Sequence, residues 1–376
     1  MPTRKLPAPA DPKSIQTALL RWYDLHKRDL PWRGIRNPYA TFISEMMLQQ
    51  TQVKTVLPYY HRFLRELPDW KALAGAKEEK VLKLWEGLGY YRRARNLKAA
   101  AEMVLRDFGG TLPDRLEEIL KLPGVGPYSA GAVLSIAFQK PYPVVDGNVI
   151  RVFSRLFLLK GNLKAGPGHR KVWELAQSLI PKDRPGDFNQ AVMELGAMVC
   201  LAENPQCLLC PLASQCRAAR KGVQNDLPEM PKAAQNVDVP MAALWMEKGG
   251  RILVRKRPGG EKWLKGMWEF PSAEGKTPEE ALGKLEKSYK TRATKTPSKD
   301  VRHQITHHKI KLGLYRAAAS KTLPAGSKWV TPDQLLALPF SSAQSKLRDW
   351  VLGNAAQEPA ATALPGPLFE KNRKRK

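Results

Sequence analysis

Cysteine is scarce in this sequence of 376 residues: there are four, and all of them lie between Cys200 and Cys216. A fold held together by several disulfides is therefore excluded. A secretory signal is not expected either, because residues 1–13 are rich in proline and charge and contain no apolar stretch. We expect an intracellular protein whose thiols stay reduced, and four reduced thiols so close together favour metal ligation.

Long hydrophobic runs are also missing, so no membrane-spanning helix and no membrane association are predicted. Acidic residues are the third shortage: 35 Asp and Glu face 62 Lys and Arg, which gives a formal net charge of +27. This excess suits a polyanionic partner such as nucleic acid. Composition alone leaves two other interpretations open, namely a basic surface that maintains solubility and attraction to a membrane surface.

The hydrophobic pattern predicts two domains joined by a linker. Apolar residues recur at i, i+3, i+4 and i+7 in the first part of the chain, between breaks at proline and glycine, which indicates amphipathic helices. One of these helices is expected over residues 115–122, with a capping box formed by Asp114 and Glu117. Short alternating or β-rich runs follow a polar linker and indicate a smaller α+β domain.

The expected boundaries are as follows. Residues 1–13 form a flexible N-terminus, residues 14–220 a mainly α domain, residues 221–237 the linker, residues 238–352 the α+β domain and residues 353–376 a basic, disordered tail. In the second domain we expect strands over residues 241–246, 251–255, 301–315 and 327–330, and helices over residues 278–289 and 342–352.

The four cysteines have the spacing C-x6-C-x2-C-x5-C at the end of the predicted helical domain: Cys200, Cys207, Cys210 and Cys216. Four thiolates within such a short segment can close on one centre, and thiolates hold either zinc or a [4Fe–4S] cluster. The alternative of four ordinary structural cysteines is less favoured, because the sequence has no cysteine elsewhere.

A glycine-containing turn, residues 122–128, joins two of the predicted helices. Gly124 and Gly126 would let the backbone turn tightly and direct N–H groups outward at a helix N-terminus, an arrangement that attracts a phosphate. A Gly-x-Gly between helices is more often only a turn. The local sequence therefore predicts a phosphate contact without requiring one.

Two carboxylates are candidates for acid–base chemistry. Asp146 is placed at or near the N-cap of a helix, where backbone N–H groups keep a carboxylate ionised and able to face a cationic sugar. Glu45 lies at the edge of an apolar helix face that includes Phe42, and an apolar wall would raise its pKa. On local sequence alone, a plain capping residue and a solvated glutamate are the commoner interpretations.

Across roughly residues 14–220, the chain resembles adenine DNA glycosylases of the MutY type, within the endonuclease III or helix–hairpin–helix superfamily. The matching runs are residues 29–33, 44–51, 87–92, 122–131 and 145–149, together with the four cysteines. The second domain more faintly resembles the Nudix-like domain appended to these enzymes, through residues 266–271 and 303–308. The resemblance implies base excision repair, with a [4Fe–4S] cluster as cofactor.

The resemblance also implies the roles of individual residues. Glu45 protonates the flipped adenine, Asp146 stabilises the sugar cation, and Tyr128 and Asn148 assist them. The remaining expected contacts with substrate and DNA are Arg28 and Arg33 in the adenine pocket, Gln50 and Tyr90 as fillers or wedges beside 8-oxoguanine, Gly124 and Gly126 at a phosphate, and Thr306 and His307 at the lesion. Many relatives carry Phe-Ser-His where this chain has Ile-Thr-His at residues 305–307.

One position separates this expectation from a rival in the same superfamily. Bifunctional members place a Schiff-base lysine just after the hairpin, where this chain has Tyr128. Hydrolysis without strand cleavage is therefore expected. The implied substrate is adenine opposite 8-oxoguanine or guanine in double-stranded DNA, and we expect a monomer in the cytoplasm of a bacterium, associated with the nucleoid.

Three alternatives stay open at this point. The first is a pyrimidine-damage glycosylase with lyase activity. The second is an iron–sulfur protein that binds DNA or transfers electrons without catalysis. The third is a Nudix hydrolase, which is disfavoured because residues 279–284 do not supply the REx2EExG signature. The histidines of residues 303–308 could also form a metal site or be exposed polar residues of a strand.

Overall fold

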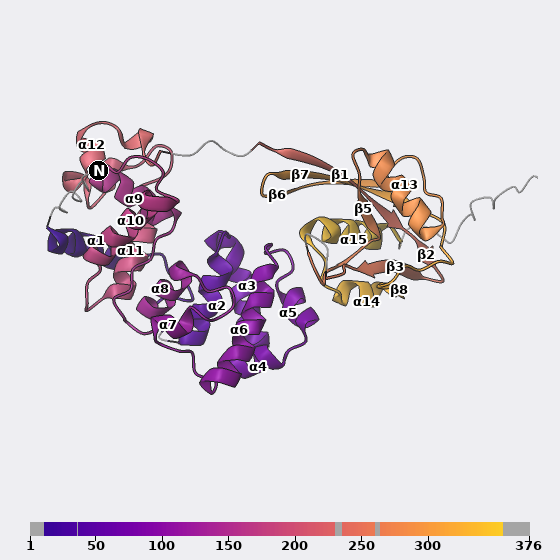
Figure 1. Cartoon of the computed structure of the whole chain (residues 1–376), viewed down its shortest axis with the longest axis horizontal. Coiled ribbons are helices and arrows are strands. Elements are labelled where there is room, and N and C mark those ends of the chain that lie inside the picture. Colours follow the sequence, from indigo (N-terminus) through magenta and orange to yellow (C-terminus); the bar gives the residue numbers. More distant parts are fainter. Residues whose placement is uncertain (1–10, 36, 230–234, 260–263, 356–376) are drawn as a thin grey trace, which may run out of the picture. The chain divides into compact units, whose positions relative to one another are not determined.

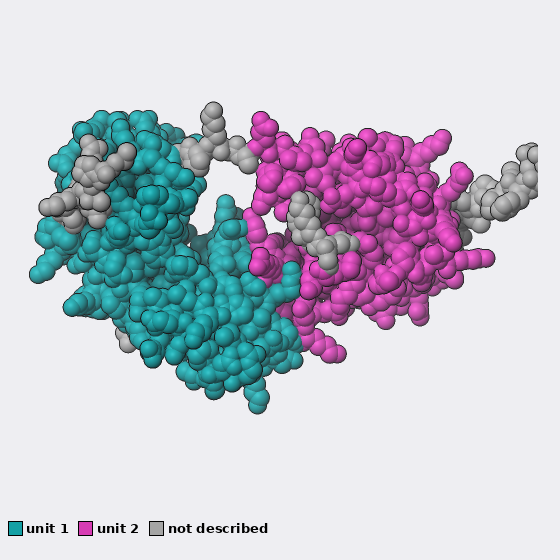
Figure 2. Space-filling view, viewed as in Figure 1, with its two compact units in different colours: residues 1–76, 93–233 teal, residues 77–92, 234–376 magenta. Residues whose placement is uncertain are grey.

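The computed structural model describes residues 11–35, 37–229, 235–259 and 264–355. The chain divides into two compact units, residues 1–76 with 93–233 and residues 77–92 with 234–376 (Figure 2). The predicted flexible N-terminus and basic tail lie mostly outside the described residues. Residues 12 and 13 and residues 353–355, however, are helical, so the first and last helices are longer than predicted.

The first unit is helical, as the sequence predicts (Figure 1). Its α-helices are α1 (Pro12–His26), α2 (Pro38–Leu48), α3 (Val53–Glu66), α4 (Trp70–Gly75), α6 (Arg92–Phe108), α7 (Leu116–Ile119), α8 (Pro127–Ile136), α9 (Gly147–Phe157), α10 (Gly166–Leu179), α11 (Pro185–Met198) and α12 (Arg217–Arg220). Helices α1 and α2 begin with an Asp or Asn cap and a proline in the first turn; in α2, Asn37 accepts a hydrogen bond from the Ala40 amide, 3.1 Å away.

Helices α2 and α8 lie at the centre of this unit, and almost all of their side chains are buried. Close packing around α8 depends on Gly131, because a Cβ there would lie 2.1 Å from the Pro143 carbonyl oxygen. A second core, which includes Leu19, Phe153 and Leu175, packs α1, α9, α10 and α11 together. The carboxyl of Glu45 in α2 therefore lies in the interior of the domain.

The predicted capping box at residue 114 is wrong. Helix α7 has only four residues, its N-cap is Arg115, and no side chain bonds the cap. The Asp114 carboxylate instead pairs with Lys140 Nζ at 2.7 Å. The Asp114 side chain therefore forms an ion pair with a residue far along the chain instead of capping the helix.

The second unit is α+β, as predicted. One sheet has the order β5-β1-β7-β6, and the other has β2, β3 and β4 with β8 paired to β3. The strands are β1 (Val237–Trp245), β2 (Glu247–Lys248), β3 (Arg251–Lys256), β4 (Trp268–Glu269), β5 (Ser272–Glu274), β6 (Lys299–Ile305), β7 (His308–Arg316) and β8 (Ser327–Val330). Residues 299–316 form a tight hairpin rather than one continuous run.

Two helices cover opposite faces of the larger sheet, because successive strand residues alternate in direction. Met241 and Ala243 of β1 share a core with α15 (Ser342–Ala355), whereas Ala242 and Leu244 share one with α13 (Pro278–Tyr289). Helix α14 (Pro332–Ala337) begins with a complete capping box at Thr331. The alternation of side chains along β1 thus determines which residues contact each of the two helices.

One segment of the first domain's sequence clusters with the second unit. Residues 77–92, which contain α5 (Glu78–Leu84), lie between α4 and α6 in the chain but pack with the C-terminal residues. The predicted boundaries did not anticipate this. The reason is visible in paired charges, such as Glu79 with Lys256 at 2.8 Å, that link residues far apart in sequence.

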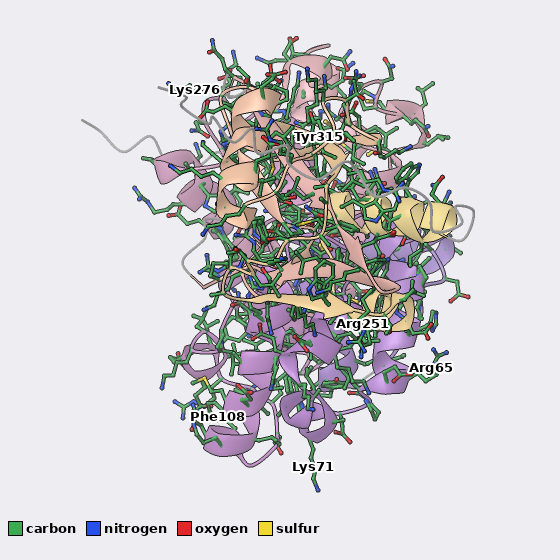
Figure 3. The ribbon with its side chains drawn as sticks, turned by 90° about the vertical axis from the view of Figure 1, so that its right-hand side faces the viewer. Arg65, Lys71, Phe108, Arg251, Lys276 and Tyr315 are labelled. Atoms are coloured by element: carbon green, nitrogen blue, oxygen red, sulfur yellow. The ribbon has the colours of Figure 1, made fainter. Side chains whose placement is uncertain are left out.

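Charged side chains cover the exterior of the helices. Arg65 and Lys71, both exposed, extend away from the ribbon of the helical unit (Figure 3). Within the described residues, none of the helices combines the length and the apolar character needed to span a membrane.

Candidate active site

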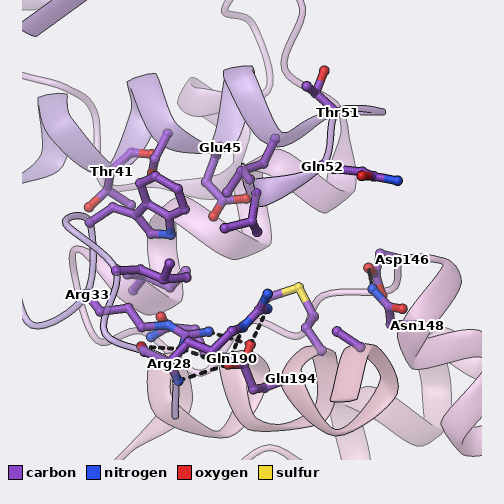
Figure 4. Close-up of a pocket in the computed structure, with 18 of the residues that line it drawn as sticks. Arg28, Arg33, Thr41, Glu45, Thr51, Gln52, Asp146, Asn148, Gln190 and Glu194 are labelled. Carbon is purple, nitrogen blue, oxygen red and sulfur yellow. Dashed lines mark hydrogen bonds and ion pairs between the residues drawn. The ribbon is translucent and has the colours of Figure 1, made fainter. Parts of the chain in front are cut away.

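A cavity of about 510 Å³ opens in the helical unit and brings together six of the predicted residues (Figure 4). They are Arg28, Arg33, Glu45, Tyr128, Asp146 and Asn148. The cavity has the size of an ordinary small-ligand pocket, and its wall combines apolar and polar groups. Segments separated by more than 100 residues of sequence meet here, which the sequence could indicate only through the resemblance.

Glu45 enters this cavity from the middle of α2 and is only 5% exposed. Burial raises the pKa of its carboxyl to about 7, opposed by the hydrogen bond from Tyr128 and assisted by the charge of Asp146. Because the residue is inside a helix, the surrounding backbone N–H groups are already bonded within the helix. Glu45 therefore can carry a proton near neutral pH, as the sequence analysis expected.

Tyr128, in the first turn of α8, is the polar neighbour of this acid. Its hydroxyl donates a hydrogen bond to Glu45 Oε2 at 3.2 Å. Burial and the two nearby carboxylates raise the pKa of Tyr128 well above its ordinary value. The phenol consequently stays a neutral donor that can orient the Glu45 carboxyl.

Asp146 is the N-cap of α9, as expected. Its Oδ1 accepts from the Val149 amide at 2.8 Å and its Oδ2 from Asn148 Nδ2 at 2.8 Å. Burial nevertheless raises the pKa of Asp146, while these bonds and the charge of Arg151 oppose the rise. The hydrogen bonds at the helix N-terminus thus offset only part of the desolvation, and an ionised Asp146 stays a prediction.

Asn148 is fixed by a residue that sequence reasoning missed. Arg151 Nη2 donates to Asn148 Oδ1 at 2.7 Å and to the Gly196 carbonyl at 2.6 Å, and its Nε donates to the Cys200 carbonyl at 2.7 Å. A Cβ at Gly196 would lie 2.6 Å from that of Asn148, so the glycine permits α11 to approach. These hydrogen bonds hold the side-chain amide of Asn148 in place, and that amide donates to Asp146.

Arg28 and Arg33 line the cavity but both bind one carboxylate, Glu194 of α11. Arg28 bonds it through Nε at 2.8 Å and Nη2 at 2.7 Å, and Arg33 through Nη1 at 3.0 Å and Nη2 at 2.7 Å. These bonds and the guanidinium charges lower the pKa of Glu194 to about 2, despite its burial. Glu194 and Gln190 form a polar wall of the cavity, and neither residue was predicted from the sequence. The signal that the sequence offered for this wall was the pair of arginines close to Trp32.

The hairpin between α7 and α8 differs at its two glycines. Gly124 has a φ of +80°, and a Cβ there would lie 2.7 Å from Asn96 Nδ2. Gly126 has an ordinary φ of −104°, caps α8, and a Cβ there would meet nothing within 4 Å. Of these two glycines, the backbone therefore requires glycine at Gly124, whereas a side chain at Gly126 would meet no neighbour.

Three of the expected DNA contacts lie in turns with a left-handed backbone: Gln50 at φ +57°, Tyr90 at φ +48° and Thr306 at φ +53°. Residues with a Cβ rarely adopt this conformation, and it commonly marks functional turns. Gln50 follows the end of α2, where Arg93 donates to the carbonyl of Met47 at 2.8 Å. Tyr90 and Thr306 belong to the second unit.

The turn between β6 and β7 exposes Thr306 and leaves His307 half-buried. The Thr306 hydroxyl donates to the Ile305 carbonyl at 2.7 Å, and the rings of His307 and His308 lie 4.1 Å apart. Across the described residues, no three His, Cys, Asp or Glu side chains stand close enough to hold a single metal ion.

The four cysteines lie in the loop after α11. Cys207 begins the 3-10 helix η1 (Cys207–Leu209), and Cys216 caps α12. Burial raises the pKa of Cys210 to about 11, with smaller contributions from the other three thiols, although among the described residues no three of these side chains are placed as ligands of a single ion. Arg155 Nη1 donates to Cys200 Sγ at 3.3 Å. An all-thiol donor set with a cation beside it suits zinc or an iron–sulfur cluster.

Comparison with known proteins agrees with both units. Residues 43–182 match the model of the HhH-GPD superfamily of base excision DNA repair proteins, and residues 241–350 match that of the NUDIX domain. An adenine DNA glycosylase of Rattus norvegicus is 36% identical over 402 residues, 90% of this chain and 78% of that protein. Its counterpart in Homo sapiens is 34% identical, with 90% and 74% covered.

The helical unit also has a counterpart of known structure. A thermostable thymine-DNA glycosylase aligns with a TM-score of 0.52 and 32% identity, over 56% of this chain and 97% of the other. The helical fold expected from the sequence is confirmed by this similarity. Because that protein is named for a different base, the scaffold by itself does not identify the base that is removed.

Proposed function

This chain belongs to the adenine DNA glycosylases, and from that premise we propose that it removes adenine paired with 8-oxoguanine or guanine in double-stranded DNA, leaving an abasic site. One observation carries the proposal: two carboxyls with different surroundings, Glu45 and Asp146, line one cavity. The thymine-directed relative and the other open alternatives make the base and the reaction the points that need testing.

The chemistry requires an acid and an anion on the same nucleotide. A base within a duplex is out of reach, so the adenosine must be extruded into the cavity. Adenine leaves easily only when a ring nitrogen is protonated, and Glu45, with its pKa of about 7, holds that proton. Cleavage leaves a cationic sugar, which an ionised Asp146 stabilises until water adds.

The surrounding residues hold these two carboxyls in place. Tyr128 orients Glu45, and Asn148 orients Asp146. A negative Asp146 also raises the pKa of Glu45, so the anion helps to keep the acid protonated. The wall formed by Arg28, Arg33 and Glu194 offers donors and acceptors to the edge of the base, on the side of the cavity opposite Glu45 (Figure 4).

For the cofactor we propose a [4Fe–4S] cluster held by Cys200, Cys207, Cys210 and Cys216. Support comes from the four clustered thiols and from family membership. When bound, the cluster would fix the loop that carries Arg217 and Arg220, two cations suited to DNA phosphates. Gly124 and Gly126 would add a phosphate contact at the N-terminus of α8.

The second unit would recognise the lesion without hydrolysing nucleotides. Thr306 and His307 are at the tip of the β6–β7 hairpin, and the left-handed Thr306 presents its side chain to solvent. Gln50 and Tyr90 would occupy the space beside 8-oxoguanine. The monomeric state stays a prediction. A place on the bacterial nucleoid also stays a prediction, since the relatives named above are mammalian.

The decisive experiment uses duplexes with adenine opposite 8-oxoguanine, guanine or thymine, followed by alkali. We expect alkali-dependent cleavage at adenine in the first two. Glu45→Gln should reduce adenine release by ~10²- to 10⁴-fold, the contribution typical of a general acid, while DNA binding is retained. Glu117→Gln makes the same change at an exposed position of the helical unit and is the matched control.

The same assay separates the alternatives. Borohydride trapping of a covalent DNA adduct would favour a lyase, and Lys54, which also lines the cavity, would be its nucleophile. Unchanged activity in Glu45→Gln would favour a protein that only binds DNA. Turnover of nucleoside triphosphates would favour a Nudix hydrolase. Any of these results contradicts the proposal.

A further inference from the structure

The loop that carries Tyr90 has an unusual backbone within the second unit. Gly87 and Gly89 have φ of +97° and +76°, and Tyr90 itself has φ +48°. Its neighbours Leu88 and Tyr91 are 5% and 4% exposed, whereas Tyr90 is 48% exposed. An aromatic ring is thus presented outward from a loop whose other large side chains are buried.

The conformation is held by hydrogen bonds inside the loop and beyond it. Trp85 Nε1 donates to the Gly89 carbonyl at 3.0 Å. The Tyr91 hydroxyl accepts from the Gly87 amide at 3.2 Å and donates to the carbonyl of Phe340 at 3.3 Å. A single phenol therefore fixes the start of the loop to a residue about 250 positions later in the chain.

Ion pairs fasten the preceding helix α5 and the turn after it to later residues of the second unit. Arg348 Nη1 of α15 binds Glu86 Oε1 at 2.7 Å, with side chains only 9% and 10% exposed. Glu79 binds Lys256 Nζ at 2.8 Å and also accepts from Trp268 Nε1 at 3.0 Å. The Arg348–Glu86 pair is so well shielded from water that it is held in one geometry, whereas both side chains of the Glu79–Lys256 pair are 43% exposed.

We propose that the C-terminal unit is the positioning platform of the Tyr90 loop, with Tyr91 and Arg348 as positioning residues that act through Tyr90. The inference rests on the proposed function, in which Tyr90 enters the base stack beside the lesion. A left-handed tyrosine relaxes toward ordinary backbone angles unless its surroundings prevent this. A preset wedge loses less conformational freedom on binding than a mobile one. The second unit thus contributes to catalysis through this loop as well as through its own hairpin.

The test uses the full chain and two mild variants, Tyr91→Phe and Arg348→Lys. Tyr91→Phe keeps the buried ring and removes only the hydroxyl. Tyr289→Phe is the matched control, because its hydroxyl also lies in the second unit and bonds Ser327 Oγ at 3.1 Å, outside the loop. Two readouts are needed: single-turnover release of adenine, and the fluorescence of a 2-aminopurine next to 8-oxoguanine, which rises when the wedge unstacks that step.

We expect Tyr91→Phe to lower the fluorescence rise and to slow adenine release opposite 8-oxoguanine by about 3- to 10-fold, the effect of one or two hydrogen bonds. Arg348→Lys should act in the same direction, and Tyr289→Phe should match the wild type. In a Tyr90→Ala background, Tyr91→Phe should cause no further loss in either readout.

Two results would overturn the inference. One is an equal loss from Tyr91→Phe with and without Tyr90, which would make the hydroxyl merely structural. The other is an unchanged fluorescence rise in both variants. Failure of the proposed function looks different, because the wild-type chain itself would then release no adenine.

Discussion

Glu45→Gln should stabilise the protein while it removes the activity. The wild-type carboxyl is 5% exposed, and burial raises its pKa from 4.5 to about 7. Glutamine has nearly the same shape, carries no charge and can still accept the hydrogen bond from Tyr128 through its amide oxygen. The substitution thus removes a desolvation cost that the wild-type fold carries whenever Glu45 is ionised.

The sign and the size follow from the two pKa values. The folded chain keeps the proton that the unfolded chain releases, so wild-type stability is full below pH 4.5, falls as the pH rises to about 7 and is constant above. At 1.36 kcal/mol for each pKa unit, the difference between 4.5 and about 7 corresponds to about 3 kcal/mol. The advantage of the variant should therefore be absent at pH 4, grow through neutral pH and level off above pH 7.

Peptide-resolved hydrogen exchange of the full chain is the appropriate assay, because two units need not unfold together. Amides of α2 and α8 report the opening free energy of the helical unit at pH values from 4 to 9. A variant that is less stable at every pH, or more stable by a constant amount, would refute the reasoning. Glu117→Gln controls for the loss of one negative charge.

Two further predictions concern the same unit. Adenine release should fall about tenfold for each pH unit above 7, as Glu45 ionises. Because the Tyr128 hydroxyl lowers the pKa of Glu45, Tyr128→Phe should move this alkaline decline of the pH–rate profile to higher pH. Single-turnover rates across pH measure both effects, and a decline at the same pH in the variant contradicts the assignment of Glu45 as the acid. Gly124→Ala should weaken binding of an uncleavable duplex and destabilise the hairpin by more than 1 kcal/mol, because of the positive φ and the 2.7 Å approach to Asn96. Binding isotherms measure the affinity, and thermal unfolding measures the stability. An unchanged affinity would show that the hairpin does not contact DNA.

The sequence predicted those features that depend on local pattern. Period-two alternation specified the strands of the second unit, and helix α13 has the predicted limits, residues 278–289. The cap at Asp146 was also visible, since an Asp before Gly and Asn is a strong helix start. The apolar helix face beside Glu45 indicated a raised pKa, but the family resemblance was needed to prefer this over a solvated glutamate.

Features that depend on contacts between distant residues were not predictable from pattern. Glu194 lies more than 160 positions from Arg28 and Arg33, and nothing in its local sequence marks it as their partner. The assignment of residues 77–92 to the second unit depends on pairs such as Glu86 with Arg348. For Asp146, the cap was predicted but not the depth of burial, and burial decided the direction of the shift.

The two carboxyls of the cavity differ because of where each sits in its helix. Glu45 lies in the middle of α2, so no backbone N–H is available to its side chain and one phenol is the neighbour that opposes its desolvation. Asp146 lies at the start of α9, where the unbonded amides of the first turn and Asn148 donate to it. Burial acts on both, but Asp146 accepts hydrogen bonds from a backbone amide and a side-chain amide, whereas Glu45 accepts one from a phenol. This difference in donors supports the proposed roles, in which Glu45 holds a proton and Asp146 a negative charge within one pocket.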